Sequence, residues 1–94
     1  MNKCLRILIT AKFPDDLLRS FIYKNAKLLG LEGTAQIVDP EEKKVRISVC
    51  GSVEALDQFV DLLHKGTKGF DLKDIEVVPF LKDKDYRSVF RVIE

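Results

Sequence analysis

The stretch from Phe13 to Gly33 constrains the fold most, because it has the pattern of an amphipathic helix. Its apolar residues recur at spacings of three and four, which places them on one helical face. These residues are Leu17, Leu18, Phe21, Ile22, Ala26, Leu28 and Leu29. Asp15 or Asp16 is suited to cap the start of this helix, and Gly30 to adopt the left-handed turn at its end. We therefore predict one helix here, with its apolar face against a core.

Segments on both sides of this helix alternate apolar and polar residues, as strands with one buried face do. The predicted strands are residues 5–12, 34–39, 44–50, 74–80 and, as a short edge strand, 88–93. The polar turn from Pro40 to Lys43 is short, so the second and third strands form a hairpin. A second helix begins with Ser52 as its cap and stops at Gly66. The charged segment 81–86 is predicted to be a loop.

The order of these elements predicts an α+β fold of the ferredoxin-like, split βαβ class. Strand, helix, strand, strand, helix and strand are followed by the added edge strand, which gives an antiparallel sheet with both helices on one face. Ninety-four residues leave room for one domain, which we predict to span residues 1–94. Odd-numbered residues of the first three strands then face the helices, and even-numbered residues face outward.

The two cysteines test this arrangement. The first and third strands are predicted to be antiparallel neighbours, so the start of one lies beside the end of the other. Cys4 and Cys50 then meet on the same outer face. We predict two neighbouring free thiols rather than a disulfide, as is usual in a reducing compartment.

Composition excludes several classes of function. The chain is 46% hydrophobic with a net charge of +1, so it can bury a core unaided and shows no bias toward a polyanion. No run approaches the roughly 18 apolar residues of a membrane span. Arg6 and Thr10 interrupt the apolar N-terminal run, which distinguishes it from a signal peptide. Two distant cysteines and the single histidine, His64, make no metal site. We therefore expect a soluble cytoplasmic protein without a metal or a membrane partner.

The spacing of a few residues resembles the acylphosphatase family across nearly the whole chain. That family has a strand, a loop of the form G-x-V-Q-G-V-x-F-R, and then alanine and two glycines at fixed intervals after the arginine. Here Arg19, Ala26, Gly30 and Gly33 stand at the same intervals. The hairpin, the glycine-led segment GSVEALDQFVDLLHKG and the final Phe-Arg-Val of residues 90–92 continue the likeness.

The resemblance implies an activity and a set of roles. Acylphosphatases hydrolyse the carboxyl-phosphate bond of acyl phosphates without a metal or cofactor. Their loop amides and arginine hold the phosphate, because backbone N–H groups at a helix start and a forked guanidinium both suit an anion. An asparagine on the second strand orients the attacking water. By this resemblance Arg19 is the phosphate-binding arginine, and Ile37 occupies the position of the asparagine.

The phosphate loop departs from the family pattern at almost every position. The corresponding residues are Phe13, Pro14, Asp15, Asp16, Leu17 and Leu18. Pro14 has no N–H to donate. Asp15 and Asp16 are more often helix caps than functional acids, but here they also bring two carboxylates toward the phosphate position. One such charge at 4 Å costs about 1 kcal/mol in water and about 4 kcal/mol near a protein surface.

The asparagine position is altered as well. Ile37 has no polar group with which to orient a water, and the neighbouring Gln36 points to the opposite face of the strand. We therefore predict an acylphosphatase-like protein that is catalytically impaired or inactive and acts as a small binding domain. The alternative is a genuine acylphosphatase in which Arg19 binds the phosphate.

The partners that remain are a small anion, an acyl phosphate or an unidentified protein. Leu8, Val38 and Val78 are predicted to form a modest apolar patch on the outer face for a protein contact. Nucleic acid is excluded, because readers of single-stranded RNA need aromatic residues on the middle strands. The outward positions there carry none: they are Arg6, Leu8, Thr10, Arg46, Ser48 and Cys50.

Overall fold

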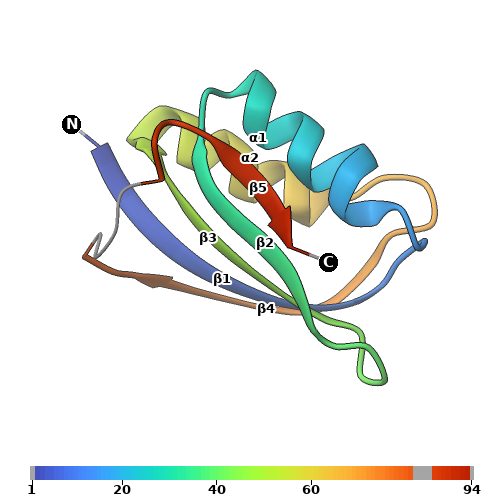
Figure 1. Cartoon of the computed structure of the whole chain (residues 1–94). Helices are drawn as coiled ribbons and strands as arrows, with labels where there is room; N and C mark the ends of the chain where they lie inside the picture. The colour runs from blue at the N-terminus through green and yellow to red at the C-terminus, as the bar shows by residue number, and fades with distance from the viewer. Residues whose placement is uncertain (1, 82–85, 94) are drawn as a thin grey trace.

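A single five-stranded sheet organises the protein, seen here in a computed structural model that describes residues 2–81 and 86–93. The strands are β1 (Asn2–Lys12), β2 (Glu32–Asp39), β3 (Lys44–Ser52), β4 (Asp71–Pro79) and β5 (Phe90–Ile93). They lie in the order β4-β1-β3-β2-β5, and all neighbours are antiparallel except β2 and β5 (Figure 1). This is the predicted ferredoxin-like α+β arrangement, with the added strand at one edge. Part of the predicted charged loop lies outside the described residues.

The first helix has a wider start than the sequence indicates. It begins as the π-helical segment η1 (Leu18–Tyr23) and continues as α1 (Lys24–Leu28). A π-helix bonds residue i to i+5 rather than i+4, so residues after it are rotated relative to an ordinary α-helix. Leu28, predicted to belong to the apolar face, is accordingly 75% exposed. Gly30 has a φ of 70°, so the predicted left-handed turn at the helix end is confirmed.

The predicted aspartate cap of this helix is wrong. Leu17 is the N-cap residue, and no side chain donates to or accepts from the first turn as a cap. Asp16 contributes its backbone carbonyl instead, which accepts from the N–H of Arg19 (3.1 Å) and of Ser20 (2.8 Å). The Asp16 carbonyl thus accepts from the third and the fourth residue after it, while the Asp15 and Asp16 side chains lie at the surface.

The second helix, α2 (Val53–Lys65), starts and ends as predicted. The Ser52 hydroxyl accepts a hydrogen bond from the Ala55 N–H (3.1 Å), which satisfies one of the free donors of the first turn. Gly66 ends the helix with a φ of 70°. Both helices lie on the same side of the sheet (Figure 1).

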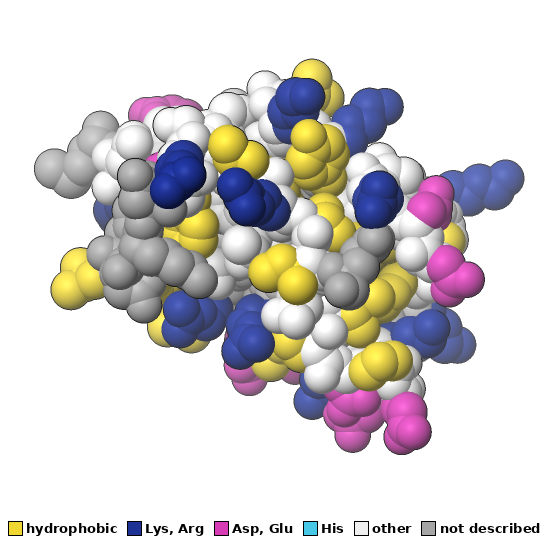
Figure 2. All heavy atoms as spheres, viewed as in Figure 1, with side chains coloured by type: hydrophobic (Ala, Val, Ile, Leu, Met, Phe, Trp, Pro, Cys, Tyr) yellow, Lys and Arg dark blue, Asp and Glu magenta, His cyan; other side chains and the backbone are white. Residues whose placement is uncertain are grey.

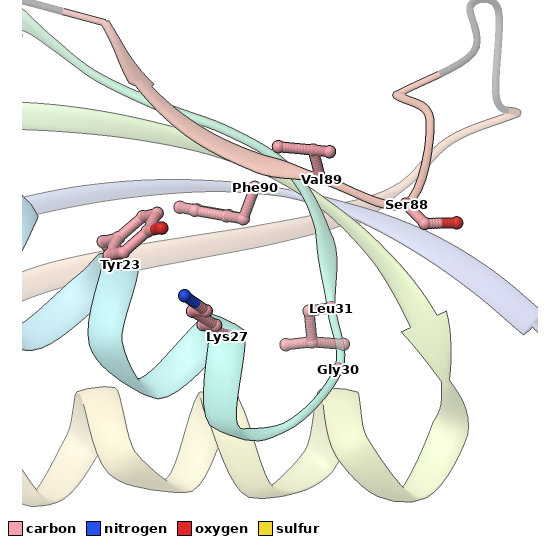
Figure 3. Close-up of a pocket in the computed structure, with 7 residues that line it drawn as sticks. All are labelled: Tyr23, Lys27, Gly30, Leu31, Ser88, Val89 and Phe90. Carbon is pink, nitrogen blue, oxygen red and sulfur yellow. The ribbon is translucent and has the colours of Figure 1, made fainter.

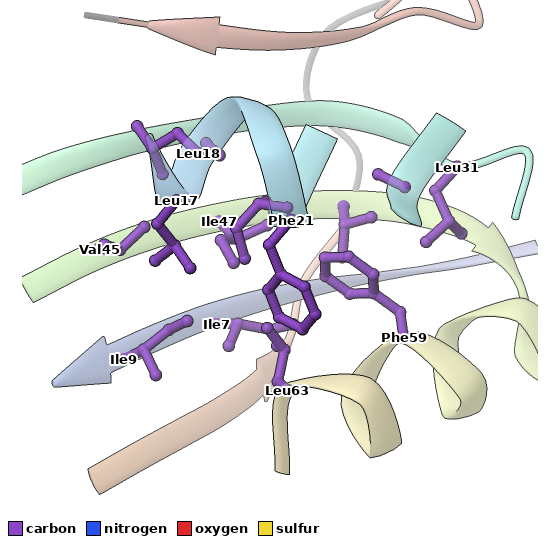
Figure 4. Packing of buried hydrophobic residues seen from close by; sticks show 14 of the residues in the cluster. Ile7, Ile9, Leu17, Leu18, Phe21, Leu31, Val45, Ile47, Phe59 and Leu63 are labelled. Atoms are coloured by element: carbon purple, nitrogen blue, oxygen red, sulfur yellow. The ribbon is translucent and has the colours of Figure 1, made fainter. Parts of the chain in front are cut away.

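The core lies between the helices and the sheet. Odd-numbered strand residues such as Ile7, Ile47 and Val49 are fully buried, as the alternation predicts. Residues of both helices pack against these strand residues. Figure 4 shows Leu17 and Phe21 of the first helix and Phe59 and Leu63 of the second helix in this core. The other face of the sheet carries the even-numbered residues.

The two cysteines lie on that other face and are joined. Cys4 and Cys50 are directly opposite in the β1–β3 ladder, with their Cα atoms 4.0 Å apart, which confirms the predicted register. The structure bonds them as a disulfide, so the prediction of free thiols is wrong. That prediction depended on the compartment, whereas the antiparallel register alone places the two sulfur atoms within bonding reach. Both residues are buried and pack with Tyr86 and Phe80.

Candidate functional site: the loop before the first helix

The loop between β1 and η1 uses its own backbone groups to close on itself. The Leu17 N–H donates to the Pro14 carbonyl oxygen (3.1 Å), and the Arg19 N–H donates to the Asp16 carbonyl oxygen (3.1 Å). Pro14 has no N–H. The amides of Leu17 and Arg19 therefore already have acceptors within the loop.

The two leucines of this loop are core residues rather than ligand-binding ones. Leu17 is 1% exposed and Leu18 is 3% exposed. Figure 4 shows Leu17 on the side of the helix that faces Val45 and Ile9 of the sheet. These side chains fix the start of the helix against the sheet, and only their backbone remains for a ligand.

Phe13 and Pro14 are held by neighbouring loops. The Lys43 amino group lies 5.4 Å from the centre of the Phe13 ring, and the Ala11 N–H donates to the Lys43 carbonyl oxygen (3.1 Å). Gly69, which precedes β4, passes so close to Pro14 that a Cβ there would stand 3.6 Å from the proline ring. The hairpin turn and the segment before β4 thus flank the loop.

The charged residues of the candidate site are exposed and close in sequence. Asp15 and Asp16 precede the helix, and Arg19 lies on its first turn, with all three side chains at the surface. One cation and two carboxylates within a single turn leave one formal negative charge in excess at the distance of a bound anion. This turn therefore presents no net positive charge to an anion.

Ile37 lies on β2 and faces the core. It is opposite Val45 on β3 and packs, half-buried, against the main hydrophobic cluster. The first helical segment contacts β2 and β5 on this side of the sheet. Gln36 lines a hollow on the opposite face, together with Arg6 and Arg46, as its predicted orientation requires. The structure thus places an aliphatic side chain at the position that the resemblance gives to a water-orienting amide.

A hollow that the sequence patterns did not indicate lies at the other end of the first helix (Figure 3). It has a volume of about 290 Å³ between the end of α1 and the start of β5. Tyr23, Lys27 and Phe90 line it, with the Lys27 amino group 5.8 Å from the Tyr23 ring centre. Strand β5 brings Phe90 there from the far end of the chain, so no local pattern could have revealed this hollow.

The predicted apolar patch on the outer face is present. Leu8, Val38 and Val78 line one hollow of about 420 Å³, although they come from three different strands. Among the described residues, no group of three or more His, Cys, Asp or Glu side chains is arranged to hold a metal. No helix in residues 2–81 or 86–93 is long and apolar enough to cross a membrane.

Comparison with known proteins gives a consistent result. The family model described as acylphosphatase matches residues 17–92, which include Arg19 and Ile37 and begin just after Asp16. An acylphosphatase of Dehalococcoides mccartyi is 33% identical over 73 residues, which are 78% of this chain and 79% of that protein. Among solved structures, an acylphosphatase from Bacillus subtilis has a TM-score of 0.83 at 21% identity, with both chains fully covered. An acylphosphatase from Coxiella burnetii has the same TM-score and identity, with 98% and 93% of the two chains covered.

Proposed function

Because this chain belongs to the acylphosphatase family, we propose that it is an acylphosphatase-like domain, spanning residues 1–94, that has lost most or all hydrolysis of acyl phosphates. It acts in the cytoplasm by binding a small anion or a protein. One observation carries this proposal: Ile37, at the position of the family's water-orienting asparagine, packs against the core.

The chemistry explains why this position matters. Hydrolysis of an acyl phosphate without a metal needs a water held in line with the bond that breaks, and a side-chain amide holds it by hydrogen bonds. An isoleucine side chain can neither donate nor accept a hydrogen bond. Water beside Ile37 has no fixed orientation, and the advantage of positioning is lost.

The loop supports the same conclusion. Pro14 lacks a donor, and the amides of Leu17 and Arg19 donate to carbonyls of the loop. Asp15 and Asp16 add two negative charges within the same turn as Arg19. A phosphate approaching this loop meets fewer free donors than an intact cradle offers, and it is repelled by both carboxylates.

Phosphate release from benzoyl phosphate by the full chain tests the proposal. We expect the wild-type rate to equal that of Arg19→Ala and of buffer alone. Lys24→Ala is the matched control, because it removes another exposed cation from the same helix. A wild-type rate far above that of buffer that falls to background in Arg19→Ala, but not in Lys24→Ala, would refute the proposal.

A wild-type rate that depends on Arg19 in this way would establish the alternative, a genuine acylphosphatase. The exposed position of Arg19 on the first helical turn favours this alternative, because its guanidinium can reach an anion from solvent. In that case Arg19 binds the phosphate of an acyl phosphate substrate, and the water is oriented by a group other than Ile37.

A further inference from the structure

The open face of the sheet, opposite the helices, carries polar side chains for which the family resemblance gives no role. Strand pairing places Arg6 on β1 opposite Ser48 on β3, and Ser48 opposite Thr34 on β2. Arg46, two residues before Ser48, is opposite Gln36 on β2. Two guanidinium groups thus flank two hydroxyls and an amide across three adjacent strands.

These side chains line a polar hollow of about 300 Å³. Its lining residues are Arg6, Thr34, Gln36, Arg46, Ser48, Tyr86 and Ile93. Among the described residues of this lining there is no carboxylate. Guanidinium, hydroxyl and amide groups are all hydrogen-bond donors, so the lining of this hollow is suited to an anion.

An apolar hollow adjoins the polar one, and the two share their arginines. Arg6 and Arg46 also line the hollow of about 420 Å³ that contains the apolar patch. Its remaining lining residues are Leu8, Val38, Lys44, Glu76 and Val78. The open face is therefore a trough with a polar end and an apolar end, and the two guanidinium groups lie at the junction.

The charges around the junction are unbalanced. Arg6 and Arg46 are diagonal neighbours on adjacent strands, and like charges so placed are unfavourable in the free protein. Within residues 2–81 and 86–93, no ion pair joins either of them to a carboxylate. Lys44 is paired with Glu42 at 3.1 Å. A bound dianion would relieve the repulsion between the two arginines.

The acids on this face, within the part of the chain that the structure describes, indicate where that anion lies. Glu76 on β4 is opposite Leu8 and therefore diagonal to Arg6, whose own partner on β4 is Val78, so this acid lies at the apolar end of the trough. The Arg6 guanidinium lies 4.7 Å from the centre of the Phe80 ring, a contact that limits its motion. Figure 2, a view with β5 in front, shows Lys and Arg side chains across the middle of that side of the molecule and Asp and Glu side chains mainly at its margins. Glu32 on β2, opposite Cys50, lies beyond Ser48 on the same face but outside the described lining of the polar hollow, so the anion is favoured between the two arginines and Ser48.

We propose that this trough binds a small organic phosphate that carries one apolar group. The phosphate bridges Arg6 and Arg46 and accepts from the Ser48 hydroxyl, since three terminal oxygens match two forked guanidinium groups. The apolar group lies over Leu8, Val38 and Val78. This site is on the opposite face of the sheet from the loop and Arg19, so it does not depend on whether the loop is active.

The surface favours a small ligand over a single-stranded nucleic acid. Stacking of successive bases needs exposed aromatic rings on the sheet. Among the described residues that line the two hollows, Tyr86 is the one aromatic side chain, and it is buried at 9% exposure. One phosphate and one apolar group, by contrast, match the two halves of the trough.

Titration of the isotope-labelled full chain with phenyl phosphate, followed by amide NMR shifts, tests the proposal. We expect saturable shifts at Arg6, Leu8, Arg46 and Ser48, and weaker binding of inorganic phosphate at the same arginines. Arg46→Gln should weaken phenyl phosphate binding about tenfold, the loss expected for one charge-assisted contact. Val78→Thr, of nearly equal size, should weaken phenyl phosphate about threefold and leave inorganic phosphate unchanged.

Two matched variants separate this site from its surroundings. Arg91→Gln removes the same charge from β5 on the same face, outside the linings of both hollows. It should leave the affinity nearly unchanged, and an effect equal to that of Arg46→Gln would show only general electrostatic attraction. Arg19→Gln should leave the affinity for phenyl phosphate unchanged. Shifts confined to residues 13–19 would contradict both this proposal and the conclusion that the loop before the first helix has lost its phosphate site.

Other results would also contradict the proposal. Absence of saturable shifts with phenyl phosphate would show that the trough binds no such ligand, while leaving the conclusion on hydrolysis untouched. Equal affinity for inorganic and phenyl phosphate would exclude a role for the apolar end. A single-stranded hexanucleotide of deoxythymidine that displaces phenyl phosphate at lower concentration would assign the trough to nucleic acid instead.

Discussion

The two helices of this protein begin in different ways, and the difference concerns function as well as stability. Helix α2 starts with the Ser52 hydroxyl as a cap that accepts from the Ala55 N–H. A side-chain cap of this kind stabilises a helix start and occupies one of its backbone donors. The first helix starts without a side-chain cap, on a π-helical turn whose leucines are buried. By the family resemblance the loop before that helix holds phosphate, and a helix start without a side-chain cap leaves backbone N–H groups available for an anion. Here Pro14 and the internal hydrogen bonds have reduced the number of those donors.

The largest effect should come from rebuilding the first helix start in the family pattern. The graft is Ala11→Gly, Phe13→Val, Pro14→Gln, Asp15→Gly, Asp16→Val, Leu18→Phe and Ile37→Asn. We expect benzoyl phosphate hydrolysis at least about a hundredfold above wild type, since donors and water positioning both return. The same graft with Ile37 retained is the control and should stay near background. A graft that folds, binds phosphate and remains inactive would show that more than these positions was lost.

Leu17→Ala should have the next largest effect, this time on stability. Leu17 anchors the uncapped helix start in the core at 1% exposure, so its removal leaves a cavity. We expect the free energy of unfolding to fall by about 3 kcal/mol, measured by urea denaturation. Leu28→Ala, on the same helix but 75% exposed, should cost less than about 0.5 kcal/mol. Equal losses in both variants would mean that packing does not hold the helix start.

Ser52→Ala compares the two caps directly. Loss of the hydroxyl leaves the Ala55 N–H without its acceptor, and the free energy of unfolding should fall by about 1 kcal/mol. Asp16→Ala, at the start of the other helix, should cost less than about 0.5 kcal/mol, because its side chain makes no cap there. Thermal or urea unfolding of the two variants measures both losses. Equal losses in the free energy of unfolding for Asp16→Ala and Ser52→Ala would contradict the contrast between the two helix starts.

The smallest effect concerns the charge of the loop. Replacing both Asp15 and Asp16 by asparagine keeps their size and removes the repulsion of an anion near Arg19. We expect inorganic phosphate to bind the loop about threefold more tightly, since exposed charges are screened by water and salt. Amide shifts of Leu17, Leu18 and Arg19 report this binding separately from the open face of the sheet. Unchanged affinity would indicate that missing donors, and not charge, limit the loop.

Much of the fold follows from periodicity. The alternation in β1 and β3 assigned residues to the two faces of the sheet correctly, and it placed Cys4 opposite Cys50. The glycines at positions 30 and 66 ended their helices as predicted, because a left-handed residue there favours glycine. The π-helical turn was missed, since a spacing of three and four does not distinguish bonds to the fourth residue from bonds to the fifth.

The candidate site depended on a different kind of inference. Arg19 and Ile37 were singled out by family resemblance, because an exposed arginine and a half-buried isoleucine carry no functional signal of their own. The trough on the open face requires the pairing of β1, β2 and β3, and residues such as Arg6 and Gln36 are far apart in the sequence. The apolar patch was predicted in part, since the alternation alone gives the outward direction of Leu8 and Val78.

The disulfide between Cys4 and Cys50 encloses β1, the first helix and the β2–β3 hairpin in one covalent ring. A protease that cuts the exposed turn at Glu41 or Glu42 would therefore release no fragment while the bond is intact. The nicked chain would migrate as one species on a non-reducing gel and separate into two only after thiol treatment. The strands that form the phosphate-binding trough thus stay tethered even after their connecting turn is cleaved.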